Sequence, residues 1–278
     1  MNTRNIFTKI TMGLRLGLVF MFFLLITSAQ RAAAQGTIMN WTIDGEKREA
    51  LVYSPAPTTN ATQHPLVFAF HGHGGNMQGA SQLMHIQSLW PAAIVVYPQG
   101  MNRPSPVDPQ AHYSGWQVEA NQANGNVGNK DLDFFDAMLA TMHQKFKVDD
   151  KRVYATGFSN GAIFSYLLWA ERGKTLAAIG ECAGRLFPAE HLTQARALLA
   201  IAGQTDTTDP FALQQQSIQD ARQVDNATGQ GQPCGQYCTF YPSTSQTPVK
   251  TLIHPGAHVY PPWAPNQIVV FFKNHEQP

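Results

Sequence analysis

Hydrophobic positions along this chain fall into short runs separated by longer segments with a helical period. The runs are rich in β-branched or aromatic residues, and a Gly, Pro or His follows each one, as is usual for buried strands. Such runs, alternating with helices, predict a mostly parallel sheet covered by helices on both faces, which is the α/β class. The runs are residues 66–70, 93–97, 152–156, 197–202 and 249–253.

Helices are predicted in the segments between and after these runs. Residues 131–146 place apolar side chains at spacings of three and four, which marks one face of a helix. Further helices are expected at residues 160–172, 212–224 and 266–273. Residues 102–128 are rich in Pro, Asn and Gly and have no period, so this segment is predicted to be a long surface loop.

The first segment of the chain has the order of an export signal. Basic residues precede an apolar run at residues 17–26, and a group of small residues ends at Ala34. The run is shorter than the roughly 20 residues that a membrane-spanning helix needs. We therefore expect residues 1–34 to be a cleaved signal peptide. Residues 35–278 would then form a single secreted or periplasmic domain.

Charge and cysteine content narrow the class of protein. The formal net charge is +1, only 13% of residues are charged, and no charged run occurs, so neither nucleic acid nor an anionic surface is expected as a partner. In an exported chain, Cys234 and Cys238 are expected to form a local disulfide. A metal pair is the alternative, but no second pair or neighbouring His completes a site. Cys182 is expected to be a buried free thiol.

A Gly-x-Ser-x-Gly motif lies at residues 157–161, between a predicted strand and a predicted helix. A sharp turn at this point lifts the hydroxyl of Ser159 out of the sheet, and small flanking residues let the two elements approach closely. The backbone N–H of Asn160, at the helix N-terminus, could then face a developing oxyanion. The motif predicts Ser159 as a nucleophile. The alternative is a tight turn with a structural serine.

A second glycine-rich loop follows the strand at residues 66–70 and reads His-Gly-His-Gly-Gly at residues 71–75. In hydrolases with this arrangement, the loop after this strand supplies the second oxyanion donor, and the N–H of His73 is the candidate. The alternative is a metal site at His71 and His73. No cluster of carboxylates or thiolates accompanies these two residues to support a metal site, and the expected serine chemistry needs neither a metal nor an organic cofactor.

The partners of such a serine follow it in the order acid, then histidine. His258 lies in a Gly/Pro-rich loop just after the last predicted strand, so it is expected to be the general base. His254, which ends that strand, and His275, near the terminus, are the alternatives. For the acid, Asp206 comes early in the turn after residues 197–202, whereas Asp209 is better explained as the N-cap of the next helix.

Three aromatic residues are candidates for lining the cleft, where they could stack on an acyl group or a sugar. Trp116 comes from the long loop, and Tyr260 and Trp263 follow His258. The alternative is that their rings hold the loops in place.

With these motifs, the sequence resembles the secreted polyhydroxybutyrate depolymerase-like and feruloyl esterase-like group (carbohydrate esterase family 1 and its relatives). The resemblance implies the α/β-hydrolase fold and ester hydrolysis by Ser159, His258 and Asp206. The sequence departs from the usual pattern of this group at residues 73, 202 and 259–262. None of these positions is a member of the implied triad, so the departures bear on the identity of the substrate and not on the catalytic reaction. The matching segments are residues 44–55, beginning at a family hairpin, 65–72, 97–100, 115–117, 131–134 and 148–161, of which the last is the most specific.

The resemblance favours feruloyl or acetyl esters of plant polysaccharide as substrates, with hydroxyalkanoate oligomers as the alternative. Insoluble polymer is less favoured, because no surface-binding module is visible. Two other classes are a non-catalytic binding protein, which the intact motif set opposes, and a peptidase, for which a lid or propeller domain would be expected. Sequons for glycosylation occur at Asn40, Asn60 and Asn226.

Overall fold

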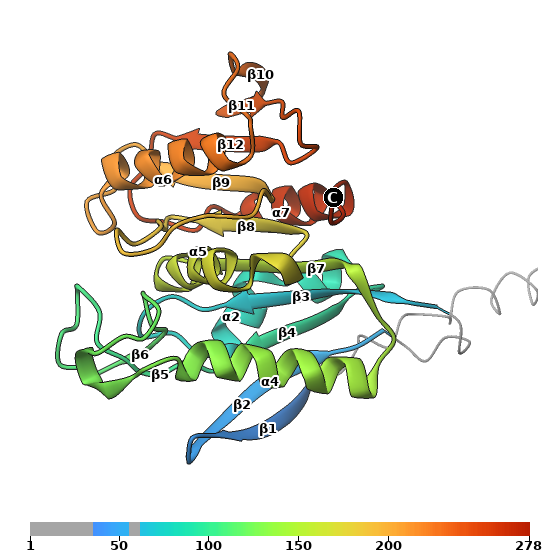
Figure 1. Ribbon diagram of the computed structural model, residues 1–278, viewed down its shortest axis with the longest axis vertical. Coiled ribbons are helices and arrows are strands. Elements are labelled where there is room, and N and C mark those ends of the chain that lie inside the picture. The colour runs from blue at the N-terminus through green and yellow to red at the C-terminus, as the bar shows by residue number, and fades with distance from the viewer. Residues whose placement is uncertain (1–35, 56–61) are drawn as a thin grey trace, which may run out of the picture. The chain divides into compact units, whose positions relative to one another are not determined.

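A ten-stranded sheet runs through the described part of the chain, which is residues 36–55 and 62–278 of this computed structural model (Figure 1). The order of its strands is β1-β2-β4-β3-β7-β8-β9-β12-β11-β10. The strands are β1 (Thr37–Ile43), β2 (Glu46–Tyr53), β3 (His64–Phe70), β4 (Ile94–Pro98), β7 (Val148–Phe158), β8 (Ala178–Cys182), β9 (Ala197–Gly203), β10 (Gln232–Gly235), β11 (Cys238–Tyr241) and β12 (Val249–His254).

Strands β4, β3, β7, β8, β9 and β12 are all parallel, and an antiparallel hairpin closes each edge of the sheet. The β1–β2 hairpin turns at Asp44 and Gly45, both of which have positive φ. A separate two-stranded ribbon joins β5 (Met101–Asn102) to β6 (Ser114–Gly115), within the segment predicted to be a loop. The mostly parallel sheet confirms the α/β prediction.

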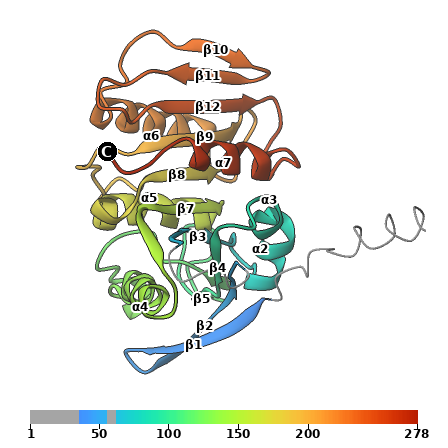
Figure 2. The same ribbon diagram turned by 90° about the vertical axis from the view of Figure 1, so that its right-hand side faces the viewer.

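Helices cover both faces of the sheet, as Figure 2 shows. One core contains α4, α5 and α6, and the other contains α2, α3 and α7. Alternate residues of β3 point to opposite cores: Leu66 and Phe68 pack with the first, Val67 and Ala69 with the second. The helices are α2 (Met77–Met84), α3 (Ile86–Leu89), α4 (Lys130–Lys145), α5 (Asn160–Arg172), α6 (Phe211–Val224) and α7 (Ala264–Lys273), with short 3₁₀ turns at Asn124–Asn126 and Gly173–Thr175.

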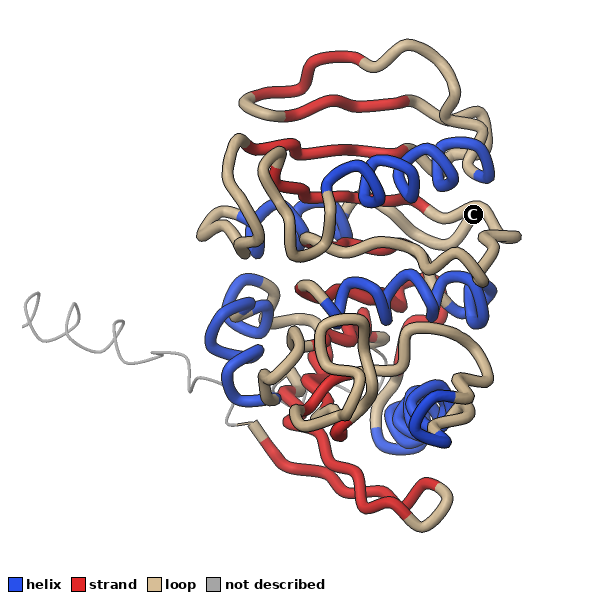
Figure 3. Tube along the Cα trace, turned by 90° about the vertical axis from the view of Figure 1, so that its left-hand side faces the viewer, coloured by secondary structure: helices blue, strands red, loops and turns tan. Residues whose placement is uncertain are grey.

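Loops that follow the carboxyl ends of the parallel strands gather on the side of the molecule that faces the viewer in Figure 3. In sheets of this kind, ligands bind outside these carboxyl ends. No helix among the described residues is long and apolar enough to cross a membrane. The predicted signal peptide and the sequon at Asn60 lie outside the described residues.

Candidate functional site

Ser159 occupies the sharp turn between β7 and α5. Its backbone has φ 56° and ψ −121°, a left-handed conformation that a residue with a side chain rarely adopts. Two glycines make the turn possible by letting main chains touch: a Cβ on Gly157 would lie 2.2 Å from the carbonyl carbon of Gly161, and one on Gly161 would lie 2.3 Å from the carbonyl oxygen of Phe70. The Gly-x-Ser-x-Gly spacing therefore follows from the close approach of β7, α5 and β3.

The structure brings the side chains of Ser159, His258 and Asp206 into one line. Nε2 of His258 lies 2.8 Å from Oγ of Ser159, and Nδ1 of the same ring lies 2.7 Å from Oδ2 of Asp206. The three residues come from the ends of β7, β12 and β9, so the parallel sheet sets their spacing. The Asp206 side chain is fully buried, and the His258 ring is 17% exposed.

Asp206 is held by several donors in addition to His258. Its Oδ1 accepts the backbone N–H groups of Thr208 at 2.9 Å and Asp209 at 3.0 Å. Its Oδ2 accepts Nε2 of Gln214, from the first turn of α6, at 2.9 Å. These hydrogen bonds hold the carboxylate in the orientation in which its Oδ2 faces Nδ1 of His258. Gln214 is fully buried. The sequence did not indicate Gln214 as a site residue, because a glutamine in a predicted helix has no distinguishing pattern.

Asp209 does not cap α6, so that prediction is wrong. The N-cap of α6 is Pro210, and it makes no side-chain cap bond. Asp209 is instead buried and forms an ion pair with Arg185. Burial is the largest influence on Asp209 and, with the nearby Asp206, raises its pKa to about 6, against the opposing effect of Arg185. The carboxylate of Asp209 thus pairs with the guanidinium of Arg185 and not with the N–H groups in the first turn of α6.

His73 and Asn160, the two predicted oxyanion donors, both line the hollow that contains Ser159. A Cβ on Gly72 would lie 3.4 Å from Cβ of Ser159, so the loop after β3 runs along the serine turn. The N–H groups of the next two residues are used, because Gly74 donates to Ser114 and Gly75 donates to Gly72. Within the described residues, the N–H groups of His73 and Asn160 have no hydrogen-bond partner.

The two histidines of the His-Gly-His-Gly-Gly loop have different surroundings. Nε2 of His71 accepts the N–H of Gly100 at 2.9 Å, and burial lowers the pKa of His71 to about 4, so the ring is neutral. Nε2 of His73 lies 3.4 Å from Oδ2 of Asp108. No group of three metal-ligating side chains occurs within residues 36–55 and 62–278.

Trp116 does not line the site, because its ring is fully buried. The indole stacks on Phe164 at 5.3 Å and donates its Nε1–H to the carbonyl of His71 at 2.9 Å. Its backbone, however, is tied to the site: the N–H of Trp116 donates to Oδ1 of Asn160 at 2.6 Å, and Nδ2 of Asn160 donates back to its carbonyl at 3.1 Å. Trp116 thus anchors Asn160 and the loop after β3.

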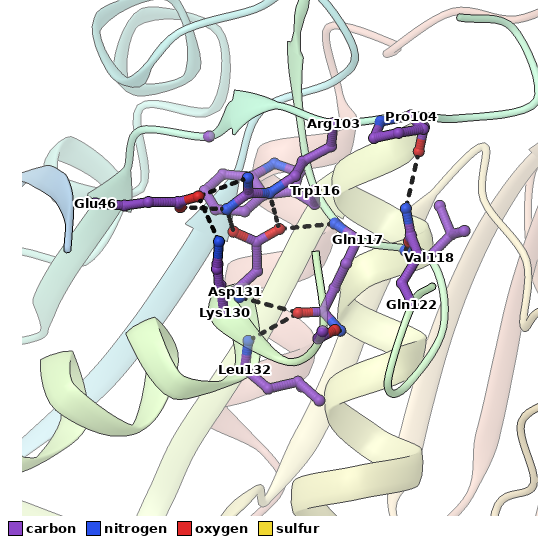
Figure 4. A network of polar contacts seen from close by, with 12 residues as sticks. Glu46, Arg103, Pro104, Trp116, Gln117, Val118, Gln122, Lys130, Asp131 and Leu132 are labelled. Carbon is purple, nitrogen blue, oxygen red and sulfur yellow. Dashed lines mark hydrogen bonds and ion pairs between the residues drawn. The ribbon is translucent and has the colours of Figure 1, made fainter. Parts of the chain in front are cut away.

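A buried charge network supports the segment next to Trp116 (Figure 4). Asp131 accepts hydrogen bonds from Arg48 at 2.7 Å, from Arg103 at 3.2 Å and from the N–H of Gln117 at 2.8 Å. The Oε1 of Gln117 in turn accepts the N–H of Asp131, which satisfies an unpaired donor in the first turn of α4. The network therefore fixes residues 116 and 117 against α4.

Tyr260 and Trp263 do not line the hollow that contains Ser159. The ring of Tyr260 packs edge-on against Phe158 at 5.7 Å, and Phe158 faces the His258 ring at 5.2 Å. Trp263 lines a separate hollow of about 280 Å³, next to the Cys234–Cys238 disulfide. The predicted disulfide is thus confirmed. Cys182 is a buried free thiol, and burial raises its pKa well above the usual value.

A small hollow of about 50 Å³ opens directly over Ser159. The lining residues that the sequence did not indicate come from four segments of the chain, so only the fold brings them together. Its lining contains the predicted His73, Ser159 and Asn160 together with Ser105, Pro106, Val107, Ile163, Arg185, Thr208 and Asp209.

Comparison with known proteins assigns this chain to a family. Residues 42–250 match the family model "Esterase", described as "Putative esterase". The chain is 28% identical over 142 residues to a bifunctional acetylxylan esterase/xylanase of Neocallimastix patriciarum, covering 50% of this chain and 18% of that protein. It is 27% identical over 188 residues to the probable feruloyl esterase C of Aspergillus oryzae, covering 64% and 62%. The chain thus spans less than two thirds of these relatives.

Solved structures share the fold at lower identity. An acetyl xylan esterase from Aspergillus awamori superimposes with a TM-score of 0.65 and 15% identity, covering 86% of this chain and all of that one. A ferulic acid esterase superimposes with a TM-score of 0.58 and 11% identity, covering 86% and 99%. The family match spans three quarters of the sequence, residues 42–250 of 278. The chain belongs to the esterase family of α/β-hydrolases.

Proposed function

We propose that this protein is a serine esterase that hydrolyses acyl esters on plant polysaccharide through an acyl-enzyme. The observation that carries the proposal is the line of hydrogen bonds from Ser159 through His258 to Asp206, at 2.8 and 2.7 Å. The choice of substrate rests on the similarity to acetylxylan and feruloyl esterases.

In the proposed mechanism, Oγ of Ser159 attacks the ester carbonyl while Nε2 of His258 takes its proton. The carbonyl oxygen becomes an oxyanion and accepts the N–H groups of His73 and Asn160. The tetrahedral intermediate collapses, the C–O bond to the alcohol breaks, and His258 returns the proton to the leaving alcohol. Water then repeats these steps on the acyl-enzyme and releases the acid. Asp206 holds the imidazole in the required tautomer and stabilises the imidazolium.

The test of the nucleophile is a fluorophosphonate probe applied to the purified protein, with the labelled peptide mapped by mass spectrometry. We expect labelling at Ser159 and loss of p-nitrophenyl acetate hydrolysis. Ser159→Ala should lower turnover by roughly 10⁴–10⁶ with little change in melting temperature. Ser88→Ala, at an exposed serine of α3, is the matched control. A folded Ser159→Ala protein that keeps a tenth of wild-type turnover would refute the assignment, and a folded wild type that takes no label would favour a non-catalytic binding protein.

We also propose that the protein is exported after cleavage of residues 1–34. The Cys234–Cys238 disulfide supports this proposal, because disulfides persist in oxidising compartments. Intact-mass measurement of the protein recovered from the medium or periplasm should give a chain that begins at Gln35. Recovery of the full-length chain from the cytoplasm alone would overturn the proposal.

A further inference from the structure

A second and much larger hollow adjoins the one over Ser159. It has a volume of about 680 Å³ and lies between the loop of residues 185–192 and the outer side of α6. Arg185 lines both hollows, so the two lie on either side of that side chain. We call the larger one the α6 hollow. Nothing in the proposed mechanism uses it.

The volumes of the two hollows indicate which part of an ester substrate each one can hold. The 50 Å³ over Ser159 is a fraction of the volume of pockets that enclose whole organic ligands, so this hollow holds only part of an ester substrate. The α6 hollow falls within the roughly 300–1,000 Å³ of pockets that hold larger organic ligands. A large substrate bound at Ser159 must therefore place its remaining bulk outside the small hollow, and the α6 hollow is adjacent.

The shape of the α6 hollow suits an extended chain. Its lining on α6 runs from Leu213 to Val224, which at a rise of 1.5 Å per residue is about 16 Å. Leu213 is 45% exposed and Phe187 faces the hollow from the opposite loop, so apolar surface is present on both walls. Exposed amide side chains, those of Gln216 and Gln223, alternate with the apolar positions.

The charges of the lining favour a neutral occupant. The guanidinium of Arg185 is already paired with Asp209 and lies 5.0 Å over the ring of Phe187. The other charged residues of the lining are the acids Glu190 and Asp220, which would repel an anionic chain. Gln216 already donates to Asp220 at 2.9 Å, but a purely aliphatic chain would take the exposed amide of Gln223 out of water without offering it a partner, which costs free energy. A neutral polysaccharide has hydroxyl groups and apolar ring faces. It can therefore form hydrogen bonds with the polar side chains of the lining and pack against the apolar ones.

We infer that the α6 hollow binds the neutral polysaccharide chain that carries the ester, while the acyl group enters the hollow over Ser159. The inference rests on the proposed function and adds to it the path of the polymer. Arg185, at the junction, separates the scissile ester from the chain.

The test uses two pairs of matched substitutions on α6. Gln216→Arg places a bulky charge in the hollow, and Gln215→Arg places the same charge on the adjacent exposed residue, which does not line it. Leu213→Arg and Ala212→Arg form the second pair, chosen by the same criterion. Melting temperatures should show that all four proteins are folded.

Kinetics on two substrates give the first measurement. For Gln216→Arg and Leu213→Arg, kcat/KM on acetylated xylo-oligosaccharide should fall about tenfold, mostly through KM, while kcat/KM on p-nitrophenyl acetate stays within twofold of wild type. The two controls should match wild type on both substrates. Equal losses on both substrates, or none on the oligosaccharide, would overturn the inference.

Binding without catalysis gives the second measurement and separates the inference from the proposed function. Xylohexaose, which carries no ester, is titrated into Ser159→Ala protein and into the same protein with each α6 substitution. We expect binding by Ser159→Ala protein that Gln216→Arg and Leu213→Arg weaken at least tenfold and the controls do not. That result supports the site even if the esterase assays fail. No binding of xylohexaose, or equal weakening by the controls, overturns it even if Ser159 proves to be the nucleophile.

Discussion

At the scale of single residues, Asp206 and Asp209 show how the same side chain acquires different properties three positions apart. Asp206 accepts two backbone N–H groups, Gln214 and His258. Asp209 contacts Arg185 and keeps one carboxylate oxygen buried without a partner. The first environment presents a carboxylate to an imidazole, and the second lets burial raise the pKa of Asp209 to about 6.

This difference predicts the effects of two isosteric substitutions. Asp206→Asn should lower kcat on p-nitrophenyl acetate by about 10⁴, because an amide facing Nδ1 favours the wrong tautomer of His258. Asp209→Asn should lower kcat by less than tenfold, since Asp209 does not contact the ring. The measurement is steady-state kinetics on both proteins at equal folded concentration. If Asp209→Asn were the crippled variant, the assignment of the acid would be wrong.

Residue type and spacing predicted Ser159, Asp206 and His258 as a set, because a strand-to-helix turn and the chain order of its partners leave a pattern in the sequence, and the fold brings the three side chains within hydrogen-bonding distance. The aromatic candidates had no such pattern. An indole is equally suited to a cleft and to a core, and the direction of the Trp116 ring is set by Phe164 and the carbonyl of His71. Arg185 also escaped prediction, because its position depends on an ion pair formed across loops.

At the scale of elements, β8 was not expected as a strand because Gly180 and Glu181 interrupt its apolar pattern. Glu181 is fully buried, which raises its pKa well above the usual value, and its carboxyl group accepts the N–H of Gly184 at 3.2 Å. The helices α4, α5 and α6 begin and end within one residue of the predicted bounds. Apolar periodicity located α4, whereas the serine motif at its start and Gly173 at its end located α5, which is buried on all sides from Asn160 to Trp169.

The β10–β11 hairpin at the sheet edge depends on its disulfide. β10 is exposed along its whole length, so little apolar burial holds it to β11. Replacing Cys234 and Cys238 with Ser should cost about 2 kcal/mol by loop closure, or roughly 4–8 °C in Tm. Activity at low temperature should stay within twofold, because Ser159 directly follows β7, at the centre of the sheet and far from this edge. Calorimetry of this double variant is the measurement.

Reduction of the wild-type protein provides the control for that prediction. Treatment with a thiol reductant should reproduce the lower Tm, and alkylation should reach Cys182 only after unfolding, because this thiol is buried. An unchanged Tm in both the reduced protein and the double variant would show that the hairpin does not need the bridge.

At the scale of the whole molecule, buried carboxyl groups make stability depend on pH. Burial raises the pKa of Asp225, at the end of α6, to about 8, although it accepts the N–H of Arg196 at 2.7 Å. In the unfolded chain the pKa is about 3.9. Between these values the folded state binds the additional proton, so the contribution of Asp225 makes the free energy of unfolding fall as pH rises from about 4 to 8.

Asp225→Asn removes this titration and should flatten the pH dependence. Urea unfolding at pH 5 and pH 8 should show a smaller loss of unfolding free energy for Asp225→Asn than for wild type. Asp150→Asn, at a carboxylate whose side chain is 80% exposed, serves as the control and should parallel wild type. Parallel curves for all three proteins would show that Asp225 does not titrate in this range.

The sequence by itself determined the fold class, the disulfide and the three side chains that line up at Ser159, since these follow from local periodicity, short spacing and chain order. Only the tertiary structure decided that Trp116 is buried, that Asp209 pairs with Arg185, and that Arg185 lines both the small hollow over Ser159 and the large α6 hollow. These features depend on contacts between segments that are far apart in the chain. The volume of a hollow depends on how several loops pack together, so no single segment of the sequence predicts it.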